Sequence, residues 1–256
     1  EPPSLGEFLF GPDYFPTERP PVFGILPFIV GSIFVTIGAL LLAVPIGVGV
    51  GIFIAEIARG PWQRVLRRVT EILAGIPSVV YGFFGVMMIG ISLDVGLQNG
   101  NLDPLVNYNV FSASVILAIM TLPTIINVTE VSIRSVNPDF AQGSMAMGST
   151  HWQTIMRVQV PAARSGIITG VILGMGRAIG ETMAVLMVAG NQPTLPDSFL
   201  RSRVRTMTMA VVNDMGYASD DHRVSLFTIA IVLFFFIMVL NVITQIITRR
   251  SNIQVA

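Results

Sequence analysis

Residues 28–55 read FIVGSIFVTIGALLLAVPIGVGVGIFIA, a stretch without a charged side chain. About 20 mostly apolar residues are enough for a helix to cross the hydrocarbon core of a bilayer. Four further stretches reach this length, so the predicted spans are residues 28–55, 72–93, 110–129, 165–190 and 226–248. No stretch alternates in the manner of outer-membrane strands. We therefore expect an all-α, polytopic transmembrane helix bundle with five spans.

The composition agrees with a membrane protein. Of 256 residues, 52% are apolar and 12% are charged, and the mean hydropathy is +0.73. An ordinary soluble domain has about twice this charged fraction. The composition excludes a disordered chain, a coiled coil and a nucleic-acid binder with a basic face, so lipid is expected as a partner and nucleic acid is not. Cysteine is absent, which excludes disulfides and thiol chemistry.

Arginine, the only basic residue besides histidine, sets the predicted orientation. The segments after the first, third and fifth spans hold nine arginines, namely Arg59, Arg64, Arg67, Arg68, Arg134, Arg157, Arg164, Arg249 and Arg250. The other side holds five, namely Arg19, Arg201, Arg203, Arg205 and Arg223. Cytoplasmic loops carry the excess of positive charge. Residues 1–27 are therefore expected outside the cytoplasm, and residues 28–256 form a transmembrane domain whose C-terminus is cytoplasmic.

The chain starts at Glu1 rather than at Met, and its first residues are rich in proline. This start leads us to expect a sixth span upstream. Near the cytoplasmic helix ends, solvent or arginine partners account for Glu56, Glu71 and Glu130.

The cytoplasmic loop over residues 136–164 is amphipathic. Its residues 137–139, NPD, predict a helix start with Asn as N-cap and Pro at the first helical position. Gly148 is suited to stop this helix in a left-handed conformation. A hydroxyl of residues 149–150 can cap a second short helix, which Pro161 is expected to end. Two short helices around a glycine form a rigid knob that suits a groove on a partner protein, or else a helix lying on lipid.

The fourth span contains Arg177 and Glu181, which lie four residues apart and can pair on one helix face. Isolated charges are costly in lipid, so both are expected to face the bundle interior or a water path. A guanidinium binds two oxygens of an oxyanion at once, and Glu181 can compete for it when substrate is absent. The alternative is a permanent salt bridge that only fixes helix packing. Thr182 and Asn191 offer hydrogen bonds to the same anion, or serve local helix structure.

Small residues recur along the same span in two ridges. The first contains Gly166, Gly170, Gly174, Ala178 and Thr182, and the second contains Gly176, Gly180 and Ala184. Such ridges let helices approach closely, either within the subunit or against a second one. In the outer loop, Arg201, Arg203 and Arg205 either gather anions, bind an acidic protein or belong to an ordinary solvated loop.

The spacing between Gly148 and residues 158–161, VQVP, resembles the cytoplasmic loop of ABC-importer permeases. That loop reads E-A-A, three residues, G, nine residues, I-x-L-P, whereas this chain has QGS at residues 142–144. The run at residues 177–191, RAIGETMAVLMVAGN, resembles the phosphate-importer permeases of the PstC type. FGILP at residues 23–27 and GIPSVVYG at residues 75–82 share this resemblance.

The resemblance implies a permease subunit of an ATP-driven phosphate importer in the bacterial cytoplasmic (inner) membrane. It also implies a second permease subunit, two cytoplasmic ABC ATPases and an extracytoplasmic phosphate-binding protein. The residues expected to couple to the ATPase are Asp139, Gln142, Gly143, Ala146, Gly148, Trp152 and Pro161. Those expected to line the substrate path are Arg177, Glu181, Thr182 and Asn191.

No phosphate-binding loop of the form G-x-x-x-x-G-K-[ST] occurs, so ATP and Mg²⁺ are expected in the partner ATPase and no cofactor on this chain. The only histidines, His151 and His222, are predicted on opposite sides of the membrane, which excludes a histidine metal cluster. A G-x-S-x-G nucleophile motif is also absent, so an enzyme is not expected. The alternatives left open are a permease for sulfate or molybdate and a passive anion channel.

Overall fold

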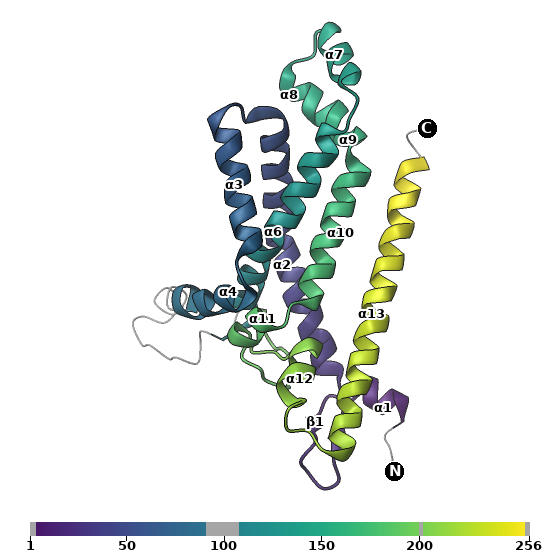
Figure 1. The fold of residues 1–256 in the computed structure, drawn as a ribbon. Helices are drawn as coiled ribbons and strands as arrows, with labels where there is room; N and C mark the ends of the chain where they lie inside the picture. The colour runs from purple at the N-terminus through teal and green to yellow at the C-terminus, as the bar shows by residue number, and fades with distance from the viewer. Residues whose placement is uncertain (1–3, 91–107, 200–201, 254–256) are drawn as a thin grey trace. The chain divides into compact units, whose positions relative to one another are not determined.

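The computed structural model describes residues 4–90, 108–199 and 202–253, which are mostly helical (Figure 1). The α-helices are α1 (Leu5–Phe10), α2 (Leu26–Ile52), α3 (Pro61–Gly75), α4 (Ser78–Phe84), α6 (Val110–Arg134), α7 (Pro138–Ala146), α8 (His151–Thr154), α9 (Val160–Ala162), α10 (Arg164–Gly180), α11 (Met183–Val188), α12 (Met207–Asp214) and α13 (Asp220–Ile253). The π-helical segments are η1 (Phe53–Ile57), η2 (Gly85–Gly90) and η3 (Ile155–Gln159). The strands β1 (Tyr14–Phe15) and β2 (Val22–Phe23) form an antiparallel hairpin.

Three helices are long and apolar enough to cross a membrane, and the number rises to five if each of two bent helix pairs counts as one span. The three are residues 26–57, 110–134 and 220–242. They confirm the predicted helices at 28–55, 110–129 and 226–248.

The span predicted over residues 72–93 is interrupted by a break between α3 and α4, where a proline in the sequence already predicted one. Pro77 lies in this break and restricts the residue before it to extended backbone, which Ile76 adopts with φ −71° and ψ 129°. Upstream of the break, α3 already begins at Pro61 and is amphipathic, so most of the segment between the first two predicted spans is helical. Residues 91–93 lie outside the described part.

The predicted helix over residues 165–190 is also interrupted. α10 ends at Gly180, and α11 begins only at Met183. The Glu181 carboxylate accepts a hydrogen bond from the backbone N–H of Ala184 at 3.2 Å, which satisfies a donor in the first turn of α11. This local capping favours a new helix start over continuation of α10.

The chain divides into two compact units. The first comprises residues 1–39, 77–118 and 178–238, and the second comprises residues 40–76, 119–177 and 239–256. The core of the first unit brings the hairpin together with α2, α12 and α13. Its buried members are Phe8, Tyr14, Phe23, Ile25, Phe28, Met207, Ala210, Ala218, Leu226 and Ile229.

Within the second unit, α6 packs between α2 and α10 (Figure 1). Glycine permits this close approach on both sides. A Cβ at Gly51 of α2 would lie 2.7 Å from Cβ of Thr129, and a Cβ at Gly174 of α10 would lie 2.9 Å from Cγ1 of Ile125. The first ridge of α10 therefore packs within the chain, whereas Gly176 of the second ridge has open space where a Cβ would stand.

Candidate functional site

At the break between α10 and α11, backbone carbonyl oxygens lack their helical partners and accept hydrogen bonds from side chains of the first unit. The Thr208 hydroxyl donates to the carbonyl oxygen of Glu181 at 3.3 Å. The Thr182 hydroxyl donates to the carbonyl oxygen of Gly180 at 3.4 Å. Glu181 and Thr182 therefore lie together at a capped helix interruption, as neighbours of α12.

A small cavity lies beside this break, lined in part by Ser32, Thr36, Glu181 and Thr206. Its volume is about 10 Å³, which is near the minimum for one water molecule. Glu181 therefore faces a space too small to enclose an oxyanion within this unit.

Arg177 lies in the last turn of α10 and its side chain is exposed. The described residues provide no hydrogen-bond or ion-pair partner for its guanidinium. Pairing with Glu181 was predicted on the premise of one continuous helix, and this premise is wrong because α10 ends at Gly180. The Glu181 carboxylate accepts a hydrogen bond from the Ala184 N–H.

Asn191 belongs to a different cavity, which has a volume of about 760 Å³. The residue adopts left-handed backbone with φ 51°, which asparagine tolerates better than most residues. Its Oδ1 is buried without a hydrogen-bond partner in the described structure. The cavity is also lined by Arg205, Asp214 and His222. The structure thus separates Asn191 from the small cavity beside Glu181.

A buried ion pair forms one wall of the Asn191 cavity. The Arg205 guanidinium binds Oδ1 of Asp214, and this oxygen also accepts hydrogen bonds from Asn213 at 2.8 Å and Tyr217 at 2.7 Å. Nε2 of His222 lies 3.5 Å from Oδ2 of Asp214. Arg205 is 7% exposed, so the alternative in which this arginine belongs to an ordinary solvated loop is wrong. Of its neighbours in sequence, Arg203 packs against Gly190, and Arg201 lies outside the described residues.

The surroundings of Asp214 shift its acidity in opposing directions. Burial raises the pKa of Asp214, but the Tyr217 hydrogen bond and the Arg205 charge outweigh burial, so the pKa falls below its ordinary value. The pKa of Tyr217 is raised in turn, first because its hydroxyl donates to Asp214. Asp214 is therefore an anion that holds a fixed set of donors.

The 136–164 loop forms two short helices with the predicted caps. The Asn137 side chain accepts from the Asp139 N–H at 3.0 Å, and Gly148 has a φ of 89°. Thr150 begins α8 in a reciprocal capping box with Gln153. These findings confirm the predicted starts and the glycine stop.

Two buried hydroxyls join the helices of this loop. Oγ of Ser144 in α7 lies 3.1 Å from Oγ1 of Thr154 in α8. The residues predicted to couple to the ATPase are all exposed, namely Asp139, Gln142, Gly143, Ala146, Gly148, Trp152 and Pro161. The exposed surface of the loop also includes the large apolar side chains Phe140, Met145, Met147 and Met156, which were not predicted as part of it. The sequence feature that could have indicated them is the presence of apolar residues between polar ones in a short loop.

The second helix ends at Ala162, one residue after the stop predicted at Pro161. The preceding segment η3 is π-helical, and the Val160 N–H bonds to the carbonyl oxygen of Ile155. This wider turn precedes Pro161, which then occupies the start of α9, where its missing N–H is tolerated.

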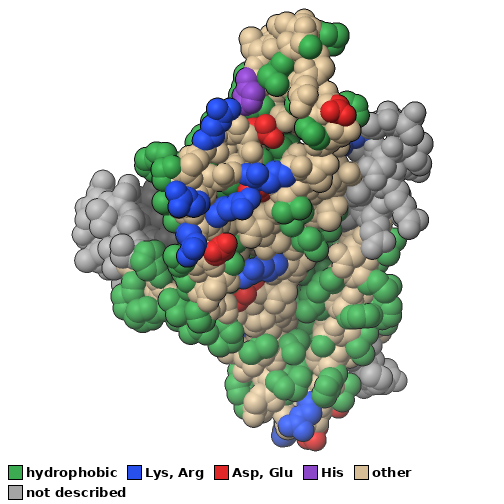
Figure 2. Space-filling view, turned by 45° about the horizontal axis from the view of Figure 1, so that its top comes forward, with side chains coloured by type: hydrophobic (Ala, Val, Ile, Leu, Met, Phe, Trp, Pro, Cys, Tyr) green, Lys and Arg blue, Asp and Glu red, His purple; other side chains and the backbone are tan. Residues whose placement is uncertain are grey.

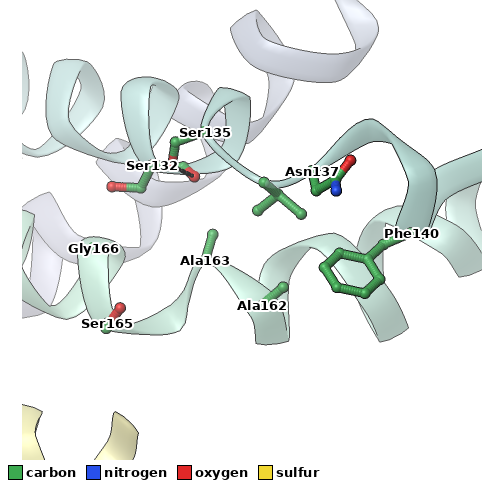
Figure 3. A pocket seen from close by; sticks show the side chains of 9 residues that line it. Ser132, Ser135, Asn137, Phe140, Ala162, Ala163, Ser165 and Gly166 are labelled. Carbon is green, nitrogen blue, oxygen red and sulfur yellow. Dashed lines mark hydrogen bonds between the residues drawn. The ribbon is translucent and has the colours of Figure 1, made fainter. Parts of the chain in front are cut away.

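A pocket of about 310 Å³ lies at the base of the loop (Figure 3). Figure 3 shows Ser132 contributed by α6, Ser135 by the turn directly after it, Phe140 by α7, and Ala162 and Ser165 by the junction of α9 with α10. The pocket therefore marks the place where the loop leaves α6 and returns to α10.

Arginine side chains gather on the face drawn in Figure 2, with acidic side chains among them. Two of the arginines in the second unit, Arg67 and Arg134, form ion pairs with Glu130. Part of the positive charge is therefore compensated within the chain.

Comparison with known proteins shows which family has this architecture. Residues 47–253 match the family described as binding-protein-dependent transport system inner membrane component. The chain belongs to this family. It is therefore a membrane-embedded permease component of an ABC importer, which makes it a transporter subunit and not itself an enzyme. Membership implies an ATPase and a substrate-binding protein as partners.

Individual relatives agree with this assignment. The "Probable ABC transporter permease protein YqgH" of Bacillus subtilis (strain 168) is 39% identical over 213 residues, which cover 83% of this permease and 67% of the relative. The phosphate transport system permease protein PstC of Xylella fastidiosa (strain 9a5c) is 30% identical over 264 residues, covering 96% and 79%. The inward-facing MetNI methionine ABC transporter superposes with a TM-score of 0.68 over 89% of this permease and 95% of that chain. Its 15% identity supports the fold alone.

Proposed function

We propose that the permease translocates inorganic phosphate into the cell. The main support is its similarity to PstC proteins from three bacteria, Xylella fastidiosa, Mesorhizobium japonicum and Pasteurella multocida. These phosphate transport system permeases are 30%, 34% and 31% identical over 96%, 83% and 95% of this chain. An exposed arginine at a helix interruption provides a suitable group for a tetrahedral oxyanion.

Arg177 binds phosphate during passage in this proposal, because its free guanidinium can donate to two oxygens at once. Glu181 and Thr182 line the path next to it, and Asn191 acts closer to the outer face. The cavity beside Glu181 is too small for phosphate. The path is therefore completed by a second permease subunit, which is either a relative or a copy of this chain.

The proposed topology counts each bent helix pair as one span, which gives five spans in the bacterial inner membrane. Residues 1–27 are extracytoplasmic, and the C-terminus is cytoplasmic. An extracytoplasmic binding protein delivers phosphate, and two cytoplasmic ATPases bind the ATP and Mg²⁺ that drive transport. This chain binds no cofactor of its own.

The 136–164 loop is the proposed coupling element to the ATPase. Its residues Asp139, Gln142, Gly143, Ala146, Gly148, Trp152 and Pro161 form the docking surface, together with the exposed apolar side chains around them. Its two helices are capped and joined by the Ser144–Thr154 contact. Because its two helices are fixed to each other, the loop can pass a movement of the ATPase on to the permease without changing its own shape.

Uptake of phosphate by the complete transporter, measured in the presence of competing oxyanions, tests which substrate the permease carries. Cells that lack their own high-affinity phosphate system would express the permease with its partner permease, ATPases and binding protein. We expect radiolabelled phosphate uptake that requires ATP and resists a large excess of sulfate or molybdate. Uptake of sulfate or molybdate in place of phosphate, by an assembled complex, would refute phosphate as the substrate.

A further inference from the structure

Glu130 is a nearly buried carboxylate on α6 that binds two arginines of the second unit. The residue is 4% exposed. Nε of Arg67 in α3 donates to its Oε1 at 2.8 Å, and Nε of Arg134 at the end of α6 donates to the same oxygen at 3.0 Å. A second guanidinium nitrogen of Arg67 also contacts this oxygen. Charge-assisted hydrogen bonds of this kind are about twice as strong as neutral ones.

The same arginines lie next to a π-helical turn. In η1 the Ala58 N–H bonds to the carbonyl oxygen of Phe53, five residues before it. The carbonyl oxygen of Ile54 accepts instead from Nε2 of Gln63 at 3.0 Å and from Arg134 at 3.2 Å. Arg134 thus contacts both the Glu130 carboxylate and the end of the α2–η1 helix. The ends of α2–η1, α3 and α6 are joined through this cluster, which we define as Gln63, Arg67, Glu130, Arg134 and the Ile54 carbonyl.

The cluster lies directly at the start of the coupling loop. Arg134 is the last residue of α6, and Asn137 caps α7 only three residues later. Ser135, which lies between them, lines the pocket at the base of the loop. A displacement of α7 therefore reaches Arg134 before it reaches any other charged residue of α6.

Hydration of a helix end does not explain why the Glu130 side chain is buried. A charged side chain at a helix end that only needed hydration would remain exposed, whereas the Glu130 side chain is 6% exposed against 47% for Arg67 and 40% for Arg134. A buried carboxylate with its donors fixed has a narrow range of geometries. Such a connection transfers the position of one helix end to the others.

We infer that Glu130 is a positioning residue that transmits movement of the coupling loop to α2 and α3. The inference rests on the proposed function, because it requires that the loop docks on an ATPase. Glu130 touches neither phosphate nor ATP in this role. Its removal should separate ATP hydrolysis from phosphate movement rather than abolish either binding event.

Reconstituted complexes in proteoliposomes provide the test, with phosphate transport and ATP hydrolysis measured on the same preparation. We expect Glu130→Gln to lower the phosphate transported per ATP about tenfold, within the usual range of coupling between sites, while hydrolysis continues. Glu130→Asp keeps the charge and should restore part of the ratio. Asp197→Asn is the matched control, since Asp197 is an exposed acidic residue outside the cluster, and should leave the ratio unchanged.

A ratio that stays native in Glu130→Gln would overturn the inference, whether transport and hydrolysis are unaffected or fall together. If Glu130→Gln fails to assemble, Arg67→Gln decides, because it removes the ion pair between α3 and Glu130 while the contacts of Arg134 remain. A native ratio in that variant would equally overturn the role. Failure of the unaltered complex to accumulate phosphate would instead refute the proposed function.

Discussion

Arg205 and Asp214 form an ion pair in which both side chains are more than nine-tenths buried, with exposed fractions of 8% and 7%. The guanidinium of Arg205 also lies over the ring of Phe28, 5.5 Å from its centroid. The pair joins the segment before α12 to the end of α12, beside the core of the first unit. It accounts for two of the charges in a loop that was predicted to be solvated.

Loss of one partner of this pair should destabilise the permease strongly. Asp214→Ala leaves Arg205 buried and unpaired, and breaking a buried pair in this way costs about 3–5 kcal/mol. Replacement of both residues, as Arg205→Met with Asp214→Leu, should recover much of this loss because no isolated charge remains. Thermal unfolding of the purified permease in detergent would measure both. A single variant as stable as the native protein would contradict the structural role.

The lowered pKa of Asp214 predicts a pH dependence. The folded state holds this proton more weakly than the unfolded state, so the stabilisation is complete above the unfolded carboxyl pKa of about 3.9 and is lost as pH falls further. The stability difference between native protein and Asp214→Asn should therefore shrink as pH is lowered from 7 to about 3. A difference that grows toward acid pH would show that the sign is wrong.

Two glycines of α10 predict opposite effects of the same substitution. A Cβ at Gly166 would lie 2.6 Å from Cβ of Ser132, so Gly166→Ala should destabilise the protein by about 1–3 kcal/mol through overpacking. A Cβ at Gly176 meets nothing within 4 Å, so Gly176→Ala should stabilise the helix by about 0.5–1 kcal/mol. Unfolding of the isolated permease compares them directly. Equal effects would contradict the difference in packing.

A charge introduced into the 136–164 loop should prevent the loop from docking on the ATPase. Ala146 is exposed among the apolar side chains of the loop, so Ala146→Glu places an unpaired charge in the proposed contact with the ATPase. We expect loss of ATPase co-purification while the permease remains folded. Gln192→Glu adds the same carboxylate at another exposed position and serves as the control. Normal co-purification of the Ala146 variant would move the docking surface elsewhere.

Local chemistry explains which features could be predicted from the sequence. Asn137, Gly148 and Thr150 bond to, or turn, the backbone within three residues of themselves, so their roles follow from short stretches of sequence. The long apolar helices follow from hydropathy in the same way. Three helices were therefore predicted at the correct places.

The rest depends on contacts between distant residues. The interruption after Gly180 is supported by Thr208, which lies 27 residues beyond Glu181. Burial of Glu130 depends on Arg67 from another helix, 63 residues away. Hydropathy treats both regions as uniform, so it predicts neither the helix break nor the burial of Glu130. Arginine partners were one of the two predicted explanations for Glu130, and the structure shows which arginines they are.

ATP-driven phosphate accumulation in proteoliposomes, compared between the native complex and Arg177→Ala, tests the central claim most directly. Arg223→Ala is the matched control, because Arg223 is an exposed arginine outside the proposed path. We predict that Arg177→Ala abolishes accumulation in a fully assembled complex, while Arg223→Ala accumulates phosphate at the native rate. Native accumulation by the Arg177 variant would contradict the assignment of Arg177 to the phosphate path.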